Sequence, residues 1–116
     1  MITGMHAVVY TTRPEEMRAF FRDVLALTGV DAGDGWLIFA LPPAEIAVHP
    51  IDHAGEHHEL TLMCDDIEAT VVELRGRGGQ FAGDVTDRGW GRTIQLLLPD
   101  ATQLMLYEPR HPVAAG

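Results

Sequence analysis

The chain has 116 residues, which is the usual size of a single domain. Hydrophobic residues make up 47% and charged residues 22% of the sequence, as in soluble globular proteins and unlike disordered chains. Eight basic and 17 acidic side chains give a net charge of −9, which argues against partners such as nucleic acid or an anionic membrane surface. The expected partner is therefore a small molecule or a second copy of the chain.

The cysteine content and the first residues favour a soluble protein of the reducing cytoplasm. Cys64 is the only cysteine, which excludes an intrachain disulfide and a cysteine-rich zinc site. We expect no signal peptide, because the chain lacks a basic start and Arg13–Glu16 interrupts the first apolar run. No stretch approaches the ~20 apolar residues of a membrane span.

The first half of the chain predicts a strand, a helix and further strands. Met5–Tyr10 is an apolar strand candidate, and Thr12 is a candidate helix N-cap with Glu15 as its capping-box partner. Gly29 and the cluster Asp31–Gly35 break the helical pattern. The apolar stripe of this helix is Met17, Phe20, Phe21, Val24 and Leu25. The strands expected after it are Trp36–Leu41 and Glu45–His49.

The second half repeats this order. His58–Cys64 is a strand candidate, and either Asp65 or Asp66 caps the helix that follows. The glycines Gly76 and Gly78 end that helix. We interpret Asp84–Gly91 as a turn-rich loop. The apolar face of the helix is Ile67, Val71 and Leu74, and the remaining strands are Gln80–Ala82, Thr93–Leu98 and Gln103–Tyr107.

Two copies of one pattern predict an α+β domain made of two βαβββ modules. Module 1 covers about residues 1–51, module 2 covers about residues 57–108, and residues 109–116 form a flexible tail. His6 and Glu59 hold equivalent positions in the first strands of the two modules. One such unit leaves an open sheet face and an unpaired edge. Two units side by side can form a curved, eight-stranded mixed sheet, a cup with flanking helices.

Five segments, which follow one another over nearly the whole chain, carry a family resemblance. They are "MHAVVY" at Met5–Tyr10, "MRAFFRDVLAL" at Met17–Leu27, "CDDIEATVVELRGRG" at Cys64–Gly78, "WGR" at Trp90–Arg92 and "LPDATQLMLYEP" at Leu98–Pro109. Together they resemble the vicinal oxygen chelate superfamily, which includes glyoxalase I, bleomycin-resistance proteins and extradiol dioxygenases. The resemblance implies the two-module fold and a homodimer. It leaves the function open, because this fold supports both metal enzymes and drug-binding proteins.

Metal enzymes of this family carry ligands on the first, fourth, fifth and eighth strands of the cup. The resemblance places these four positions at His6, Ala47, Glu59 and Met105. Only His6 and Glu59 can ligate a divalent ion, because a methionine thioether is a poor ligand for Mg, Mn, Fe or Ni. The inherited metal site is therefore predicted to be incomplete.

Neighbouring side chains leave a metal site possible. Alternate residues of a strand share a face, so Glu45 or His49 could join His6 and Glu59 around a divalent ion such as Ni, Mn, Fe or Zn. A shift of the fifth strand by one residue would instead present His58. The cofactor prediction is thus either none or a divalent metal ion.

Other polar and aromatic residues are candidate ligand contacts at the mouth of the cup. Trp90, in a glycine-rich loop, could stack on a planar or cationic ligand, whereas Trp36 is a better candidate for the core. Arg92 could pair with an anionic group, although a solvated arginine is the common alternative. The further candidates for ligand binding are Tyr107, His49 and Met105.

These observations favour two functions. The first is a small-molecule binding protein, which takes a hydrophobic or aromatic ligand in its cup without the full metal site of the family. The second is a small lyase, isomerase or dioxygenase-like enzyme in which His6 and Glu59 act as general acid and base, with or without a divalent ion. Whether the chain is an enzyme stays open. So does the question whether its modules pair within one chain or across a homodimer.

Overall fold

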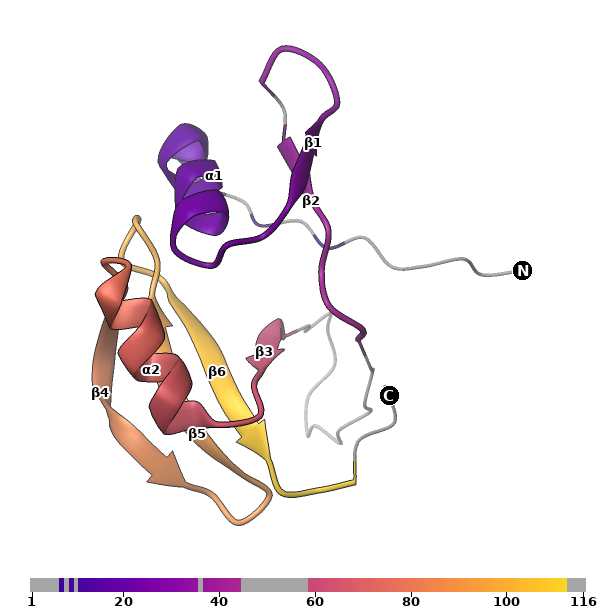
Figure 1. Cartoon of the computed structure of the whole chain (residues 1–116). Helices are drawn as coiled ribbons and strands as arrows, with labels where there is room; N and C mark the ends of the chain where they lie inside the picture. The colour runs from indigo at the N-terminus through magenta and orange to yellow at the C-terminus, as the bar shows by residue number, and fades with distance from the viewer. Residues whose placement is uncertain (1–6, 8, 10, 36, 45–58, 113–116) are drawn as a thin grey trace, which may run out of the picture.

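The computed structural model describes residues 7, 9, 11–35, 37–44 and 59–112. Within these residues, strands form a two-stranded sheet and a four-stranded sheet of order β3-β6-β5-β4 (Figure 1). No helix in the described ranges is both long and apolar enough to cross a membrane. The elements are α1 (Pro14–Asp23), β1 (Gly29–Asp31), β2 (Leu37–Phe39), β3 (Thr61–Met63), α2 (Ile67–Gly76), β4 (Gln80–Asp87), β5 (Gly91–Leu97) and β6 (Gln103–Pro109).

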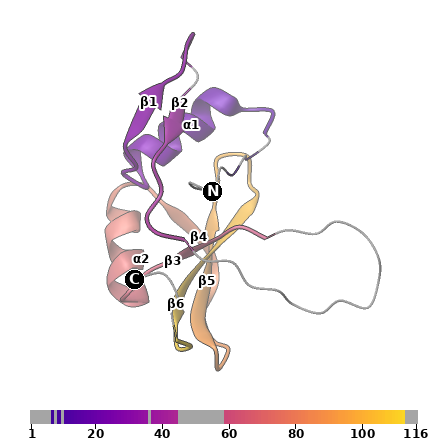
Figure 2. The same cartoon turned by 90° about the vertical axis from the view of Figure 1, so that its right-hand side faces the viewer.

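Helix α2 covers one face of the four-stranded sheet (Figure 2). Strand β3 pairs with β6 in parallel, and the β6-β5 and β5-β4 pairs are antiparallel. The buried residues of the α2 face form one core cluster: Ile67, Val71, Leu74, Ile94, Leu106 and Val24. Each fully buried aliphatic side chain of this kind contributes roughly 1.5–3 kcal/mol relative to an exposed one. Both described helices thus pack on the face of the sheet that carries Ile94, Leu104 and Leu106.

The start of α2 is fixed to the sheet by two carboxylates. The Asp66 side chain accepts a hydrogen bond from the backbone N–H of Ala69 at 3.1 Å, so Asp66 is the N-cap, one of the two residues predicted for this position. The Glu108 carboxylate of β6 accepts a bond from the backbone N–H of Ile67, also at 3.1 Å. Both interactions satisfy N–H groups that have no partner within the helix.

Helix α1 begins differently from the prediction. Its N-cap is Arg13, which makes no side-chain capping bond, so the predicted capping role of Thr12 is wrong. The β5–β6 turn holds this segment instead: the Thr11 hydroxyl donates to the Asp100 carboxylate at 3.0 Å, and the Arg13 guanidinium donates to the carbonyl oxygen of Pro99 at 2.8 Å. Beneath this connection, Met17, Leu98 and Leu104 form the second core cluster.

Two strands depart from the prediction. Strand β1 lies at Gly29–Asp31, in a segment predicted only to break the helix, and β4 runs through Asp87 into the predicted loop. Register shifts between Ala82 and Thr86, where Gly83 has a φ of +75°, allow β4 to continue past an irregularity. The mixed α+β class is confirmed. The predicted strand at Glu45–His49 and most of the one at Met5–Tyr10 lie outside the described residues.

Candidate functional site

The face of the four-stranded sheet that is turned away from α2 collects several of the predicted site residues. Residues directly opposite one another on paired strands share a face. The register therefore places Met105 beside Gln95 and Thr61, and Tyr107 beside Thr93 and Met63. We call this surface the site face, defined by Thr61, Met63, Thr93, Gln95, Met105 and Tyr107.

One end of the site face opens into a hollow of about 330 Å³. Its wall contains the apolar side chain of Met105, the amides of Gln95 and Gln103 and the exposed carboxylate of Glu59. The structure thus brings Glu59 and Met105, two of the predicted site residues, to one hollow. Amide and carboxylate groups beside apolar side chains are typical of a pocket that orients a small molecule.

The other end of the site face is aromatic. The Trp90 and Tyr107 rings meet edge to face, with their centroids 5.5 Å apart and an angle of 70° between their planes. Tyr107 is 8% exposed and Trp90 is 46% exposed, so Tyr107 supports a tryptophan that is still open to a ligand. A Cβ atom at Gly91 would lie 3.2 Å from the Tyr107 ring, so glycine allows this close approach.

His111 joins this aromatic group, although the sequence places it in a flexible tail. Its Nδ1 lies 2.8 Å from the carbonyl oxygen of Pro112, and its Nε2 lies 3.4 Å from the hydroxyl of Tyr107. Because a carbonyl only accepts hydrogen bonds, Nδ1 carries the proton. In the neutral ring Nε2 is then the acceptor, so the Tyr107 hydroxyl donates to it. The sequence carried no signal for this contact.

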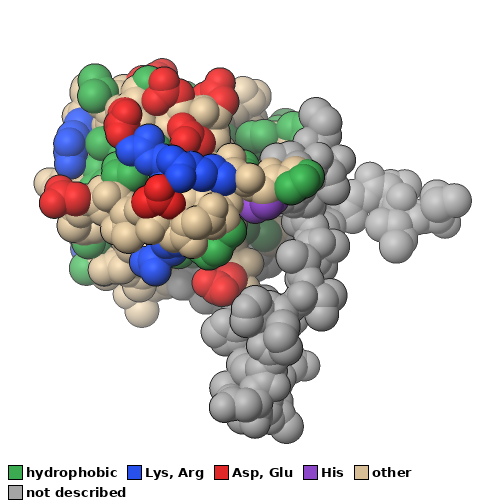
Figure 3. Space-filling view, turned by 90° about the horizontal axis from the view of Figure 1, so that it is seen from below, with side chains coloured by type: hydrophobic (Ala, Val, Ile, Leu, Met, Phe, Trp, Pro, Cys, Tyr) green, Lys and Arg blue, Asp and Glu red, His purple; other side chains and the backbone are tan. Residues whose placement is uncertain are grey.

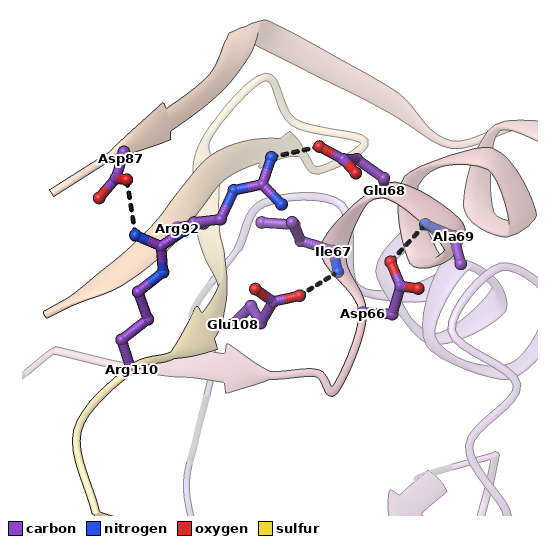
Figure 4. A network of polar contacts seen from close by, with 8 residues as sticks. All are labelled: Asp66, Ile67, Glu68, Ala69, Asp87, Arg92, Glu108 and Arg110. Carbon is purple, nitrogen blue, oxygen red and sulfur yellow. Dashed lines mark hydrogen bonds and ion pairs between the residues drawn. The ribbon is translucent and has the colours of Figure 1, made fainter. Parts of the chain in front are cut away.

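Arg92 lies on the other face of the sheet. It lies two residues before Ile94 on β5, so both side chains are on the face toward α2. There the Arg92 guanidinium forms an ion pair with Glu68 (Figure 4). The hydrogen bond with Glu68 raises the pKa of Arg92. This geometry does not bring Arg92 to Met105 and Tyr107, and its predicted role in ligand binding gains no support from it.

Arg88, in the turn between β4 and β5, contacts the site face and is not among the predicted site residues. Its Nε donates a hydrogen bond at 3.0 Å to the hydroxyl of Thr93, which is only 2% exposed. Thr93 lies beside Tyr107 in the cross-strand register, so the Arg88 guanidinium reaches the aromatic end of the site face. Period-two alternation could have placed Thr93 on this face, but no sequence pattern pointed to Arg88.

Cys64 follows β3 and is half-buried. Burial raises the pKa of its thiol, with smaller contributions from nearby carboxylates, and its Sγ lies 3.6 Å from the carbonyl oxygen of Tyr107. A thiol with a raised pKa is a poor nucleophile at neutral pH. The structure therefore supports a packing role for Cys64.

The described residues leave the predicted metal site untested. Oxygen donors that line the hollow are found on Glu59, Gln95, Thr102 and Gln103, and Met105 adds a thioether, which is a poor ligand for Mg, Mn or Fe. In the part of the chain that the structure describes, no three His, Cys, Asp or Glu residues gather to form a metal site. The predicted ligands His6, Glu45 and His49 lie outside the described residues, as does the alternative His58.

The sequence matches the family model of the Glyoxalase/Bleomycin resistance protein/Dioxygenase superfamily over residues 5–109. The chain belongs to this superfamily. The match covers nearly the whole chain, so the resemblance expected from the sequence is confirmed. No curated protein matches the chain.

Solved structures of the superfamily share the fold. TnmS3, an antibiotic binding protein from Streptomyces sp. CB03234, is 22% identical with a TM-score of 0.67, and the match covers 94% of this chain and 98% of that one. A superfamily member from Sphaerobacter thermophilus is 21% identical with a TM-score of 0.66, covering 92% and 98%. Lactoylglutathione lyase from Agrobacterium tumefaciens is 15% identical with a TM-score of 0.63, covering 91% and 92%. Both a binding protein and an enzyme thus share this fold.

Proposed function

We propose that this member of the glyoxalase superfamily binds a small hydrophobic or aromatic molecule on its site face, without the full metal site of the related enzymes. The observation that carries the proposal is the pairing on one face of a ligand-sized hollow and the exposed Trp90 ring above Tyr107. An aromatic ligand stacked on Trp90 would remove apolar surface from water, at about 25 cal/mol per Å². The amides of Gln95 and Gln103 would orient its polar groups.

A cup around the ligand needs a second sheet opposite the site face. We propose that the two modules form the curved eight-stranded cup, either within one chain or between the chains of a homodimer. A planar molecule would then be enclosed between the two halves. The location of the protein in the cytoplasm stays a prediction that rests on the single Cys64.

The binding proposal is tested with a neutral, planar probe, 2-naphthamide, by isothermal titration calorimetry. Trp90→Ala should weaken the affinity about tenfold, because it removes a stacking surface. Val72→Ala is the matched control: Val72 is an apolar side chain on α2, 70% exposed and away from the site face, so this variant should bind like the wild type. Equal affinity of Trp90→Ala and the wild type, or binding that a chelator abolishes, would contradict the proposal.

The enzyme remains a second candidate because the exposed Glu59 carboxylate lines the hollow, where it could exchange a proton with a bound substrate. In this proposal His6 is the partner acid or base. Elemental analysis of protein purified without a histidine tag, followed by titration with Ni, Mn, Fe and Zn, separates the two functions. Near-stoichiometric metal that is lost in both His6→Ala and Glu59→Gln would favour the metal enzyme over the binding protein.

A further inference from the structure

We infer that Arg88 is an anion-binding residue of the site face, and that the ligand carries a carboxylate attached to its aromatic ring. The inference rests on the proposed function above and extends it by naming the chemical class of the ligand. Three observations carry it: the anchoring of the Arg88 guanidinium, the absence of an acidic partner for it among the described residues, and the aromatic surface beside it.

The turn between β4 and β5 holds Arg88 at the edge of the site face. The backbone N–H of Arg88 donates to the carbonyl oxygen of Gly91 at 2.9 Å, which closes the turn. The Nε–H of the side chain donates to Thr93, so one edge of the guanidinium is already used. Among the described residues neither Nη group has a hydrogen-bond partner, and the side chain is exposed. Thr93 is thus a positioning residue for Arg88.

The other arginines at this end of the sheet are neutralised. Arg92 pairs with Glu68, and Arg110 pairs with Asp87 at 2.7 Å, both on the α2 side (Figure 4). Basic and acidic side chains accordingly alternate across this end of the molecule, with the histidine and hydrophobic groups beside them (Figure 3). Arg88 differs from these arginines, because among the described residues no carboxylate forms an ion pair with it.

Asp87 precedes Arg88 in the chain but does not neutralise it. The Asp87 carboxylate accepts a hydrogen bond from the backbone N–H of Gly89 at 2.9 Å and pairs with Arg110. Because Asp87 is opposite Arg92 in the β4–β5 register, it lies on the α2 side of the sheet. Within the described ranges no carboxylate neutralises Arg88, so we assign its charge to the ligand.

The geometry of this charge favours a carboxylate. Two parallel N–H groups match the two oxygens of a planar carboxylate, and the match is specific to guanidinium. The chain has a net charge of −9, so its overall field repels anions, and selection of an anionic ligand needs a local contact such as this one. Trp90 and Tyr107, beside Thr93, offer the apolar surface for the ring that carries the carboxylate.

The test compares 2-naphthoate with 2-naphthamide, which have the same ring and differ in charge. We expect the wild type to bind 2-naphthoate about tenfold more tightly, near the lower end of what hydrogen bonds to a charged group provide. Arg88→Gln should reduce this preference to less than twofold. Arg88→Lys, which keeps the charge but loses the two-pronged geometry, should fall between them. Circular dichroism checks that each variant is folded.

Arg92→Gln is the matched control, because it removes the same charge from the α2 side. It should keep the tenfold preference. Three results would overturn the inference while leaving the proposed function intact. The wild type could bind both probes equally, Arg88→Gln could keep the preference for 2-naphthoate, or Arg92→Gln could lose as much of that preference as Arg88→Gln. Failure of both probes to bind would overturn the proposed function, and the inference with it.

Discussion

Gly91 offers a direct test of the close packing beneath the site. It lies at the start of β5, and a Cβ atom there would come within 3.0 Å of the carbonyl oxygen of Glu108 and 3.2 Å of the Tyr107 ring. The first neighbour is backbone of β6 and the second is a buried ring, so neither can move away freely. We expect Gly91→Ala to be overpacked and to displace Tyr107 from beneath Trp90.

The expected size of this effect follows from known overpacked variants, which lose about 1–3 kcal/mol of stability. For a domain of this length, 1 kcal/mol corresponds to roughly 4 °C in the melting temperature. Gly91→Ala should therefore melt about 4–12 °C below the wild type in differential scanning calorimetry. The same variant should bind 2-naphthamide more weakly, because the Trp90 ring loses its support.

Gly76→Ala separates packing from a general effect of replacing glycine. Gly76 ends α2, and a Cβ atom there meets nothing within 4 Å. Since alanine favours the helix by about 0.5–1 kcal/mol, this variant should be as stable as the wild type or slightly more stable. If Gly91→Ala melted and bound 2-naphthamide like Gly76→Ala, the reasoning on the β5–β6 contact would be refuted.

Two further predictions concern ionisable groups. Because burial raises the pKa of Cys64, its reaction with Ellman's reagent should be slow at neutral pH and reach half its maximal rate at a higher pH than that of a free thiol; a fast reaction at pH 7 would contradict this. Hydrogen bonds from Thr102, with a smaller one from Thr11, lower the pKa of Asp100. Its carboxylate therefore stabilises the fold at neutral pH, and this contribution is lost as the pH falls below about 4 through the lowered pKa. The difference in melting temperature between wild type and Asp100→Asn should shrink over that range, and a constant difference would contradict the assignment.

The sequence predicted the structure of the second half of the chain best, because the local signals there agree with one another. Asp66 caps α2, the apolar residues Ile67, Val71 and Leu74 face the sheet, and the glycines after the helix end it. Alternating buried residues in β5 and β6 then fix which face meets the helix. Each of these features depends on residues that are close in the chain.

The predictions failed where distant contacts decide the local structure. Thr12 has the chemistry of an N-cap, but Thr11 and Arg13 bind the β5–β6 turn, and that contact sets the geometry of the chain before α1. Strand β4 crosses residues that are typical of turns, because pairing with β5 stabilises them beyond the irregularity near Gly83. Such pairings join residues that no local pattern links.

The sequence singled out Trp90 and Tyr107 as candidate site residues, but it did not predict the contact between them. Trp90 precedes β5 and Tyr107 lies in β6, and the two meet because the backbone N–H of Arg110 donates to the carbonyl oxygen of Trp90 at 2.9 Å. This hydrogen bond ties the residue before β5 to the residue after β6. His111 reaches Tyr107 for the same reason, since it follows Arg110 directly.

The charges of the site face come from loops, because its strand positions carry none. Period-two alternation assigns Arg92 to the face of Ile94 and leaves only threonine, glutamine and apolar residues on the site face. Its two described charges are Glu59, before β3, and Arg88, in the β4–β5 turn. Glu59 shares the hollow with Gln103, whereas Arg88 lies at the level of Tyr107. Tyr107 is four residues after Gln103 on β6, so the two levels are about 13 Å apart. An anionic ligand is therefore expected to place its carboxylate at the aromatic end, away from Glu59, so the two loop charges determine the orientation of the ligand.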